Sequence, residues 1–247
     1  MKHSPTKKNL TAFIVMCLAT YLGLMNIQIV NSSFKEIQGG LAIGPEQISW
    51  VLTSALIAEV IMLPLAGWLC RLVSTKWLFA GCLFGFTVAS AGCAMAWNIE
   101  SMILFRALQG FCGGALMPLV FATTYYVFPK HQHTAVMTIL SFVLVTPIAI
   151  APLIGGWITE ALTWRWMFWF SIPAGITLML ASIVFIKIDK AEFYLARNID
   201  FLGIALAATA LLFLIVVLEE GRRHDWFASK LILGLTIASA ISAYLFV

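Results

Sequence analysis

The sequence has very few charged side chains for its length. Of its 247 residues, 11% are Asp, Glu, Lys or Arg, whereas a typical soluble domain has about 25%. Hydrophobic residues make up 62% of the chain, so too few polar side chains remain to cover a water-exposed surface. The composition argues against a soluble globular protein and favours an integral membrane protein.

The residue patterns of several other function classes are also missing. The five cysteines lie within or beside apolar runs, without a CxxC pair or a nearby histidine, so we interpret them as helix-packing residues. We therefore expect no disulfide, no metal site and no cofactor. The net charge of +4 is not gathered into a basic stripe with interleaved aromatics, which argues against nucleic acid as a partner. The apolar runs contain no His-x-x-Glu-His, Gly-x-Ser-x-Gly or paired-acid cluster, which argues against an enzyme.

The sequence does contain eight long apolar runs. A helix needs about 20 apolar residues to cross the hydrocarbon core of a bilayer. Because backbone polar groups cannot stay unpaired in lipid, each run is predicted to be a transmembrane helix, and the fold class to be all-α integral membrane. The runs lie at approximately residues 10–31, 48–70, 77–97, 102–127, 135–158, 166–186, 200–218 and 229–247.

Basic residues are distributed unevenly between the loops. If the N-terminus is cytoplasmic, the inner loops hold nine basic and three acidic residues, and the outer loops five basic and seven acidic ones. This bias follows the positive-inside rule, so we predict a multi-pass protein of the bacterial inner membrane with a cytoplasmic N-terminus. The chain stops on the apolar segment Tyr244–Val247 without a polar tail, so we expect a fragment or a truncated product.

Two charged residues fall inside the predicted spans. Glu59 lies near the middle of the second span, and Arg106 lies one turn inside the fourth. A charge at such a depth costs about 3 kcal/mol or more unless it is paired or faces water, so intramembrane charges usually serve a function. We interpret Glu59 as a group that loads and releases protons, with a structural, hydrogen-bonded acid as the alternative. Arg106 either has a partner inside the bundle or extends to the membrane interface, and pairing between the two residues stays open.

Five segments carry a resemblance to a known family. The fourth run contains Arg106-Ala-Leu-Gln109-Gly110 followed by Gly113-Gly114, which matches the pattern RxxQGxxxG. By this and four further motifs in the expected order, the chain resembles the major facilitator superfamily, in its fourteen-helix drug:proton antiporter branch of the EmrB/QacA type. The further motifs are Ala151-Pro152-Leu-Ile-Gly155-Gly156 (similar to GPxxGG), Gly67-Trp-Leu…Lys76, Trp164-Arg165-Trp166-Met-Phe168…Pro173-Ala-Gly175 and Asp200-Phe-Leu-Gly203…Glu220-Gly221…Asp225-Trp226-Phe227.

The resemblance implies a domain organisation and a function. Residues 1–190 would form the N-terminal six-helix half of a major facilitator transporter, and residues 191–247 two additional transmembrane helices. The implied activity is proton-coupled efflux of amphipathic small molecules, with the substrate, protons, the lipid bilayer and a periplasmic membrane-fusion adaptor as partners. Two alternatives stay open: a truncated, non-transporting membrane subunit or scaffold, and a transporter of a metabolite.

The resemblance also implies candidate site residues. Glycines in the motifs allow close approach of helices, and prolines are expected to kink the fifth span. The proton-coupling candidates are Glu59 and Arg106. The substrate-cavity candidates are Asn26, Gln28, Asn31, Gln109, Tyr21, Phe121 and Tyr125, and the conformational candidates are Gly67, Arg71, Lys76, Gly110, Pro147, Pro152, Gly155 and Gly156.

The chain departs from the family pattern where a carboxylate is expected. The first span of the family usually carries LDxTIxN, and Asn26 stands here in place of the aspartate. In the loop after the second span, Arg71 stands where the motif has an acid, and Ser74 where it has glycine. We therefore hypothesise that the titrating carboxylate has moved from the first span to Glu59 on the second.

Overall fold

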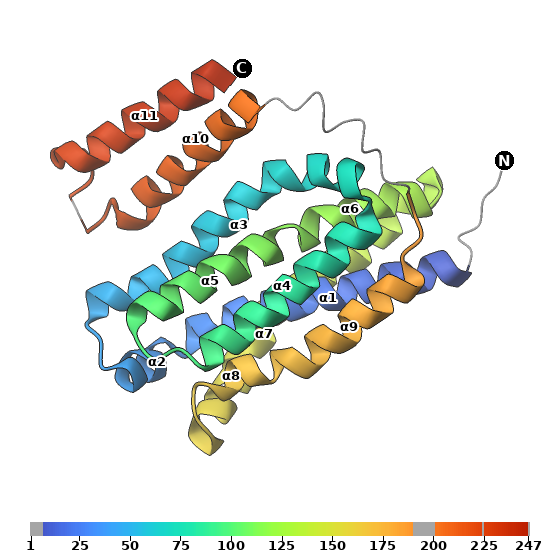
Figure 1. The fold of residues 1–247 in the computed structure, drawn as a ribbon, viewed down its shortest axis with the longest axis horizontal. Helices are drawn as coiled ribbons and strands as arrows, with labels where there is room; N and C mark the ends of the chain where they lie inside the picture. The colour runs from blue at the N-terminus through green and yellow to red at the C-terminus, as the bar shows by residue number, and fades with distance from the viewer. Residues whose placement is uncertain (1–6, 190–200, 224, 247) are drawn as a thin grey trace.

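The computed structural model describes residues 7–189, 201–223 and 225–246, and all regular structure within them is helical (Figure 1). This confirms the predicted all-α fold class. The elements in chain order are α1 (Lys7–Ser32), α2 (Phe34–Leu41), α3 (Pro45–Val73), α4 (Thr75–Ala94), α5 (Ile99–Gly114), α6 (Leu116–Val127), η1 (Lys130–Gln132), α7 (His133–Ala161), α8 (Trp166–Trp169), α9 (Ser171–Phe185), α10 (Phe201–Glu220), η3 (Trp226–Ala228) and α11 (Lys230–Phe246).

Seven helical segments of the described chain are long and apolar enough to cross a membrane. Helices α5 and α6 act together as one such segment, and so do α8 and α9. Helix α11 is also apolar, but its 17 described residues are fewer than a typical span needs. These segments match the predicted runs in order and position. The expected boundary between the two parts of the chain falls in residues 190–200, which lie outside the described residues.

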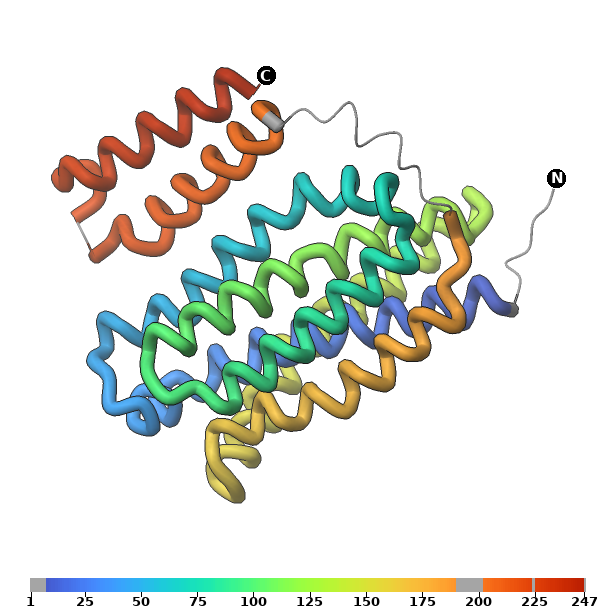
Figure 2. The backbone as a smooth tube through the Cα atoms, in the orientation of Figure 1, coloured from blue at the N-terminus to red at the C-terminus, as the bar shows by residue number. Residues whose placement is uncertain are grey.

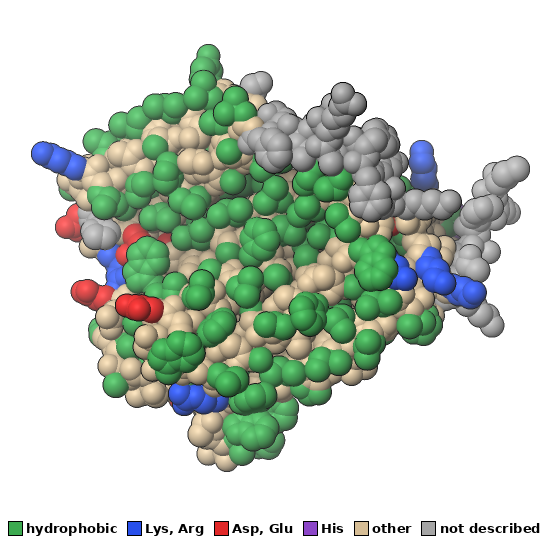
Figure 3. Space-filling model, in the orientation of Figure 1, with side chains coloured by type: hydrophobic (Ala, Val, Ile, Leu, Met, Phe, Trp, Pro, Cys, Tyr) green, Lys and Arg blue, Asp and Glu red, His purple; other side chains and the backbone are tan. Residues whose placement is uncertain are grey.

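The helices run back and forth along one common direction, so the loops gather at the two ends of the bundle (Figure 2). In the face that Figure 3 shows, charged side chains lie toward these ends, with hydrophobic side chains between them. Lys8, Arg71, Lys76, Lys130 and Lys187 all belong to the end at which α1 begins. This arrangement is that of a multi-pass membrane protein, with an apolar band between two polar ends.

The six predicted spans of the N-terminal half form one bundle. Helix α1 contacts α7, α9 and α6, whereas α3 packs against α5, and α4 against both α5 and α9. Helices α10 and α11 form a separate hairpin that contacts the bundle through α3 (Figure 1). Helix α5 is therefore packed mainly against α3 and α4.

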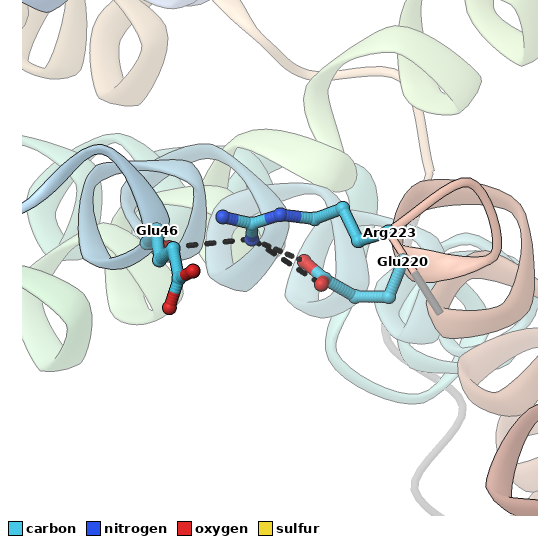
Figure 4. A network of polar contacts seen from close by, with 3 residues as sticks. All are labelled: Glu46, Glu220 and Arg223. Atoms are coloured by element: carbon cyan, nitrogen blue, oxygen red, sulfur yellow. Dashed lines mark hydrogen bonds and ion pairs between the residues drawn. The ribbon is translucent and has the colours of Figure 1, made fainter. Parts of the chain in front are cut away.

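The hairpin is fastened to the bundle by an arginine at the end of α10. The Nη1 atom of Arg223 donates a hydrogen bond to the backbone oxygen of Glu46 in the first turn of α3, at 3.3 Å. The same atom forms an ion pair with Glu220, also at 3.3 Å, and these three residues meet between α3 and α10 (Figure 4). Glu220 is buried, although it lies at a helix end. The contact joins the end of α10 to the start of α3.

Candidate functional site

The centre of the bundle holds a buried arginine with several hydrogen-bond acceptors. Only 1% of the Arg106 surface is exposed. Its Nε atom donates to the backbone oxygen of Val51 on α3 at 3.3 Å, and Nη1 donates to Gln109 Oε1 at 2.7 Å and to Asn26 Oδ1 at 3.3 Å. Of the two orientations that the sequence left open, the structure shows the one that faces the bundle interior.

The acceptors of Arg106 are themselves held by two serine hydroxyls. The Nδ2 atom of Asn26 donates to Ser171 Oγ on α9 at 3.0 Å, and Gln109 Nε2 donates to Ser90 Oγ on α4 at 2.7 Å. These residues are all buried. The Arg106 network therefore links α1, α3, α4, α5 and α9, so a change in the charge around Arg106 acts on five helices at once.

Glu59 on α3 lies beside this network without a direct ion pair to Arg106. Both residues line a cavity of about 20 Å³ that Thr20, Gly23 and Gly113 also border. Within the described residues, the Nη2 atom of Arg106 is buried and has no hydrogen-bond partner, and no ion pair joins Glu59 to Arg106 within 4 Å. The volume is sufficient for about one water molecule. Glu59 thus shares one small cavity with Arg106, which has one unsatisfied guanidinium nitrogen.

Glycines on α5 explain why α3 comes so close to Arg106. A Cβ atom added at Gly110 would overlap the backbone carbonyl of Ala55. One added at Gly114 would lie 2.5 Å from the carbonyl oxygen of Glu59 and 2.9 Å from its Cα atom. Only glycine fits at these two positions, which are spaced as GxxxG, a pattern typical of closely packed membrane helices. The backbone of Glu59 is therefore held directly against the helix that carries Arg106.

The structure brings together only some of the predicted cavity residues. Asn31 lines a second small cavity, of about 40 Å³, together with Glu59 and Arg106. Its Nδ2 atom donates to Gln28 Oε1 at 3.3 Å on the exposed side of α1. Asn26 and Gln109 contact Arg106 directly, as described above. Asn26, Asn31 and Gln109 thus lie beside Arg106, whereas Gln28 lines neither of the two cavities.

The three predicted aromatic residues lie elsewhere. Tyr21 is on the opposite face of α1, in a groove beside α7 and α9. Phe121 packs against the hydrophobic core around α6, and Tyr125 is 63% exposed, with its ring edge-on to His133. The structure does not place these side chains in the cavity of Glu59. Sequence position alone could not separate them, because the face of a helix is decided by its neighbours.

The conformational candidates form no single cluster. Gly155 packs on α1, where an added Cβ atom would lie 2.7 Å from Ser32 Oγ, whereas Gly67 and Gly156 have open space around them. Pro147 is buried and Pro152 exposed, and α7 continues as one helix through both. Arg71 is exposed, and Lys76 lies 5.1 Å from the centre of the Trp77 ring.

One contact at the end of the bundle where α1 begins was not predicted from the sequence. The backbone N–H of Thr75, at the start of α4, donates to both carboxylate oxygens of Asp189 at 3.0 Å. The Thr75 hydroxyl donates to Asp189 Oδ2, also at 3.0 Å. Asp189 follows α9 and thereby caps α4 from a distant part of the chain. An acid is thus present beside the motif loop, although Arg71 occupies the position where the motif has one.

Comparison with known proteins decides the family. A family model described as "Major Facilitator Superfamily" matches residues 16–247. The chain belongs to the major facilitator superfamily. Two solved structures of transporters share its fold: a bacterial homologue of the lysosomal transporter Spinster (TM-score 0.62, 13% identity, 97% of this chain and 60% of that one) and the nucleoside transporter NupG (TM-score 0.63, 16% identity, 97% and 66%).

Among curated members of the superfamily, the chain is similar to several resistance and export proteins. It is 35% identical to the colistin resistance protein EmrB of Acinetobacter baumannii over 226 residues, and 30% identical to the multidrug export protein EmrB of Escherichia coli over 230 residues. It is also 30% identical to the fatty acid resistance protein FarB of Neisseria gonorrhoeae over 250 residues. These alignments cover 91%, 93% and 100% of this chain, but only 44%, 44% and 49% of the relatives. The chain thus spans about half their length.

Proposed function

We propose that this chain is the N-terminal part of a drug:proton antiporter that exports amphipathic small molecules across the bacterial inner membrane. The observation that carries the proposal is the cavity shared by Glu59 and Arg106, whose Nη2 atom has no hydrogen-bond partner within the described residues. The similarity to multidrug export proteins supports the direction and the broad substrate class. The basic residues at the end where α1 begins support a cytoplasmic N-terminus.

The proposed coupling rests on the charge balance around Arg106. The acceptors that contact Arg106 directly are neutral: the Val51 carbonyl, Gln109 and Asn26. Arg106 stays protonated under all physiological conditions, so an ionised Glu59 is the counter-charge that balances it. When Glu59 takes up a proton, the guanidinium becomes an unbalanced charge in a low-dielectric bundle, which is costly. Proton uptake therefore favours a conformation that gives Arg106 water or an anionic partner.

The substrate is proposed to bind on the side of α1 and α5 where Asn31, Gln109 and Glu59 gather. In major facilitator proteins this region lies between two helical halves that alternate access to the two sides of the membrane. The residues of α1 that line the Glu59 cavity, among them Thr20 and Gly23, share one face of the helix. A periplasmic adaptor as a further partner stays a prediction from the family resemblance.

The decisive experiment compares Glu59→Gln with Glu100→Gln in the complete protein. A fluorescent dye that the unmodified protein transports is added outside everted membrane vesicles, and a proton gradient is applied with or without an uncoupler. We expect Glu59→Gln to abolish gradient-driven dye movement, because the amide cannot take up a proton. Glu100→Gln changes an acid in the first turn of α5 and is expected to transport normally. Uncoupler-sensitive transport that persists in Glu59→Gln would contradict the proposal.

A further inference from the structure

Two rows of hydrogen bonds run outward from the buried side chain of Arg106. In the first, which we call the Ser90 row, Arg106 Nη1 donates to Gln109 Oε1, and Gln109 Nε2 donates to Ser90 Oγ, both at 2.7 Å. The Ser90 hydroxyl then donates to the backbone oxygen of Phe86 at 2.8 Å, one turn earlier on α4. The Ser90 row therefore begins at a cation and ends on the backbone of another helix.

The second row, which we call the Ser171 row, repeats this pattern. Arg106 Nη1 donates to Asn26 Oδ1 at 3.3 Å, and Asn26 Nδ2 donates to Ser171 Oγ at 3.0 Å. The Ser171 hydroxyl donates to the backbone oxygen of Met167 on α8, at 3.4 Å. The five side chains of the two rows are each at most 5% exposed. Bulk water therefore does not compete for these hydrogen bonds.

All the hydrogen bonds of both rows point away from Arg106. A serine hydroxyl has one hydrogen, and Ser90 and Ser171 each donate theirs to a backbone carbonyl. Each serine oxygen can then only accept from the amide that contacts it, so the amide turns its nitrogen to the serine and its oxygen to Arg106. Hydrogen bonds aligned in this way polarise one another. The negative ends of both rows thus face the guanidinium group.

The two rows decide how Arg106 tolerates the loss of its counter-charge. A guanidinium group has five N–H donors. In Arg106 the neutral acceptors Val51, Gln109 and Asn26 take three hydrogen bonds. Glu59 borders the same cavity as Arg106. When Glu59 is neutral, the buried charge of Arg106 depends more strongly on the dipoles of these acceptors, because a buried cation needs compensation.

We propose that Ser90 and Ser171 are positioning residues of the proton site. They anchor the two amide acceptors and thereby hold Arg106 in place while Glu59 carries a proton. Neither serine lines the cavities of Glu59, so both act through the amides. This inference rests on the proposed function for the proton on Glu59, but the hydrogen-bond rows themselves need no proton gradient.

The test is a double-mutant cycle on the complete protein, measured as the folding equilibrium constant in mixed micelles with increasing SDS. Glu59→Gln imitates the neutral acid, and Ser90→Ala removes the anchor of the Ser90 row. The matched control is Ser182→Ala. Ser182 on α9 is 0% exposed, and its hydroxyl donates to the backbone oxygen of Met179 at 2.6 Å, so its loss removes a buried local hydrogen bond outside both rows.

We expect Ser90→Ala to lower the folding equilibrium constant about 2- to 100-fold more in the Glu59→Gln background than in the unmodified protein, as coupled residues of one network do. Ser171→Ala should act in the same direction with a smaller effect, because its hydrogen bonds are longer. Ser182→Ala should have the same effect in both backgrounds. If the effect of Ser90→Ala is also the same in both, the serine only stabilises its own helix and the proposal is wrong.

Ser90→Thr is the conservative variant, because threonine in a helix keeps the hydroxyl and its bond to the preceding turn. Its added methyl group changes stability by itself, but we expect the same change in both backgrounds. Ser90→Ala should reduce uncoupler-sensitive dye movement about 2- to 10-fold, and Ser90→Thr should restore it. Coupling to Glu59→Gln that persists in Ser90→Thr would assign the effect to side-chain volume and overturn the proposal.

The cycle and the dye assay separate the two proposals. Coupling between Ser90→Ala and Glu59→Gln, together with uncoupler-sensitive transport that persists in Glu59→Gln, would contradict the proposed function. It would leave the link between the serines and Arg106 intact. Loss of transport in Glu59→Gln without such coupling would support the proton site and refute the role of the serines.

Discussion

Because α3 and α5 are in close contact, we expect alanine substitutions at two neighbouring glycines of α5 to have different effects. At Gly114, an added Cβ atom would lie 2.5 Å from the carbonyl oxygen of Glu59, whereas at Gly113 it would meet the Phe86 ring at 3.8 Å. The first distance is about 0.9 Å shorter than the 3.4 Å at which ordinary contacts begin, and the nearby atoms belong to the backbone. Gly114→Ala must therefore push α3 away from α5, and Gly113→Ala need not move anything.

Only Gly114→Ala should destabilise the protein. Overpacking of a tight interface costs about 1–3 kcal/mol. Replacement of a helical glycine by alanine where space exists stabilises by about 0.4–1 kcal/mol, chiefly because the unfolded chain loses freedom. We therefore expect Gly114→Ala to lower the free energy of unfolding and Gly113→Ala to leave it equal or raise it. Because the overlap at Gly114 is with the backbone of Glu59, Gly114→Ala should also reduce proton-driven transport.

The assay is reversible unfolding of the complete protein in mixed detergent micelles with increasing SDS, followed by tryptophan fluorescence. Gly67→Ala, at a position with open space on α3, serves as a second control for the effect of an added methyl group. Equal unfolding free energies for the Gly113→Ala and Gly114→Ala proteins would show that α3 and α5 are not in backbone contact. The explanation for the position of Glu59 would then be wrong.

Three further predictions concern contacts at the two ends and the centre of the bundle. Asp189→Ala should cost about 0.5–1 kcal/mol of unfolding free energy and speed hydrogen exchange in the first turn of α4, because it removes the cap of that helix. Arg223→Ala should change the unfolding free energy by less than about 1 kcal/mol but broaden the spin-label distance distribution between α3 and α10. Asn26→Asp in a Glu59→Gln background should restore uncoupler-sensitive efflux, since it supplies a carboxylate 3.3 Å from Arg106 Nη1.

The order and positions of the spans could be predicted because the physics of the bilayer is simple. Any segment that crosses the membrane must be long, apolar and helical, so composition alone locates it. The close approach at Gly110 followed from the same kind of reasoning, since glycines at a spacing of four usually mark a packed face. The inward orientation of Arg106 did not follow, because a position one turn from a helix end permits either direction.

The partners of the Arg106 network could not be predicted from the sequence. Serine hydroxyls in helices usually donate to the carbonyl of the preceding turn, and Ser90 does so with Phe86 at 2.8 Å. Nothing in the sequence indicates that the same hydroxyl also accepts a bond from Gln109 on another helix. The cap that Asp189 provides for α4 joins residues 114 positions apart, so no local pattern reveals it. Such contacts are decided by tertiary packing.

Under the proposed coupling, the position of Arg106 would allow the proton-carrying acid to lie on either of two helices without losing its partner. The guanidinium lies between α1 and α3 and donates to both, at Asn26 and at the Val51 carbonyl. A carboxylate at the corresponding depth of either helix therefore meets the same fixed cation. The coupling that we propose requires one acid within reach of Arg106 and a backbone held close enough by Gly110 and Gly114. The helix that supplies the acid is free to differ, and in this chain the acid beside Arg106 belongs to α3.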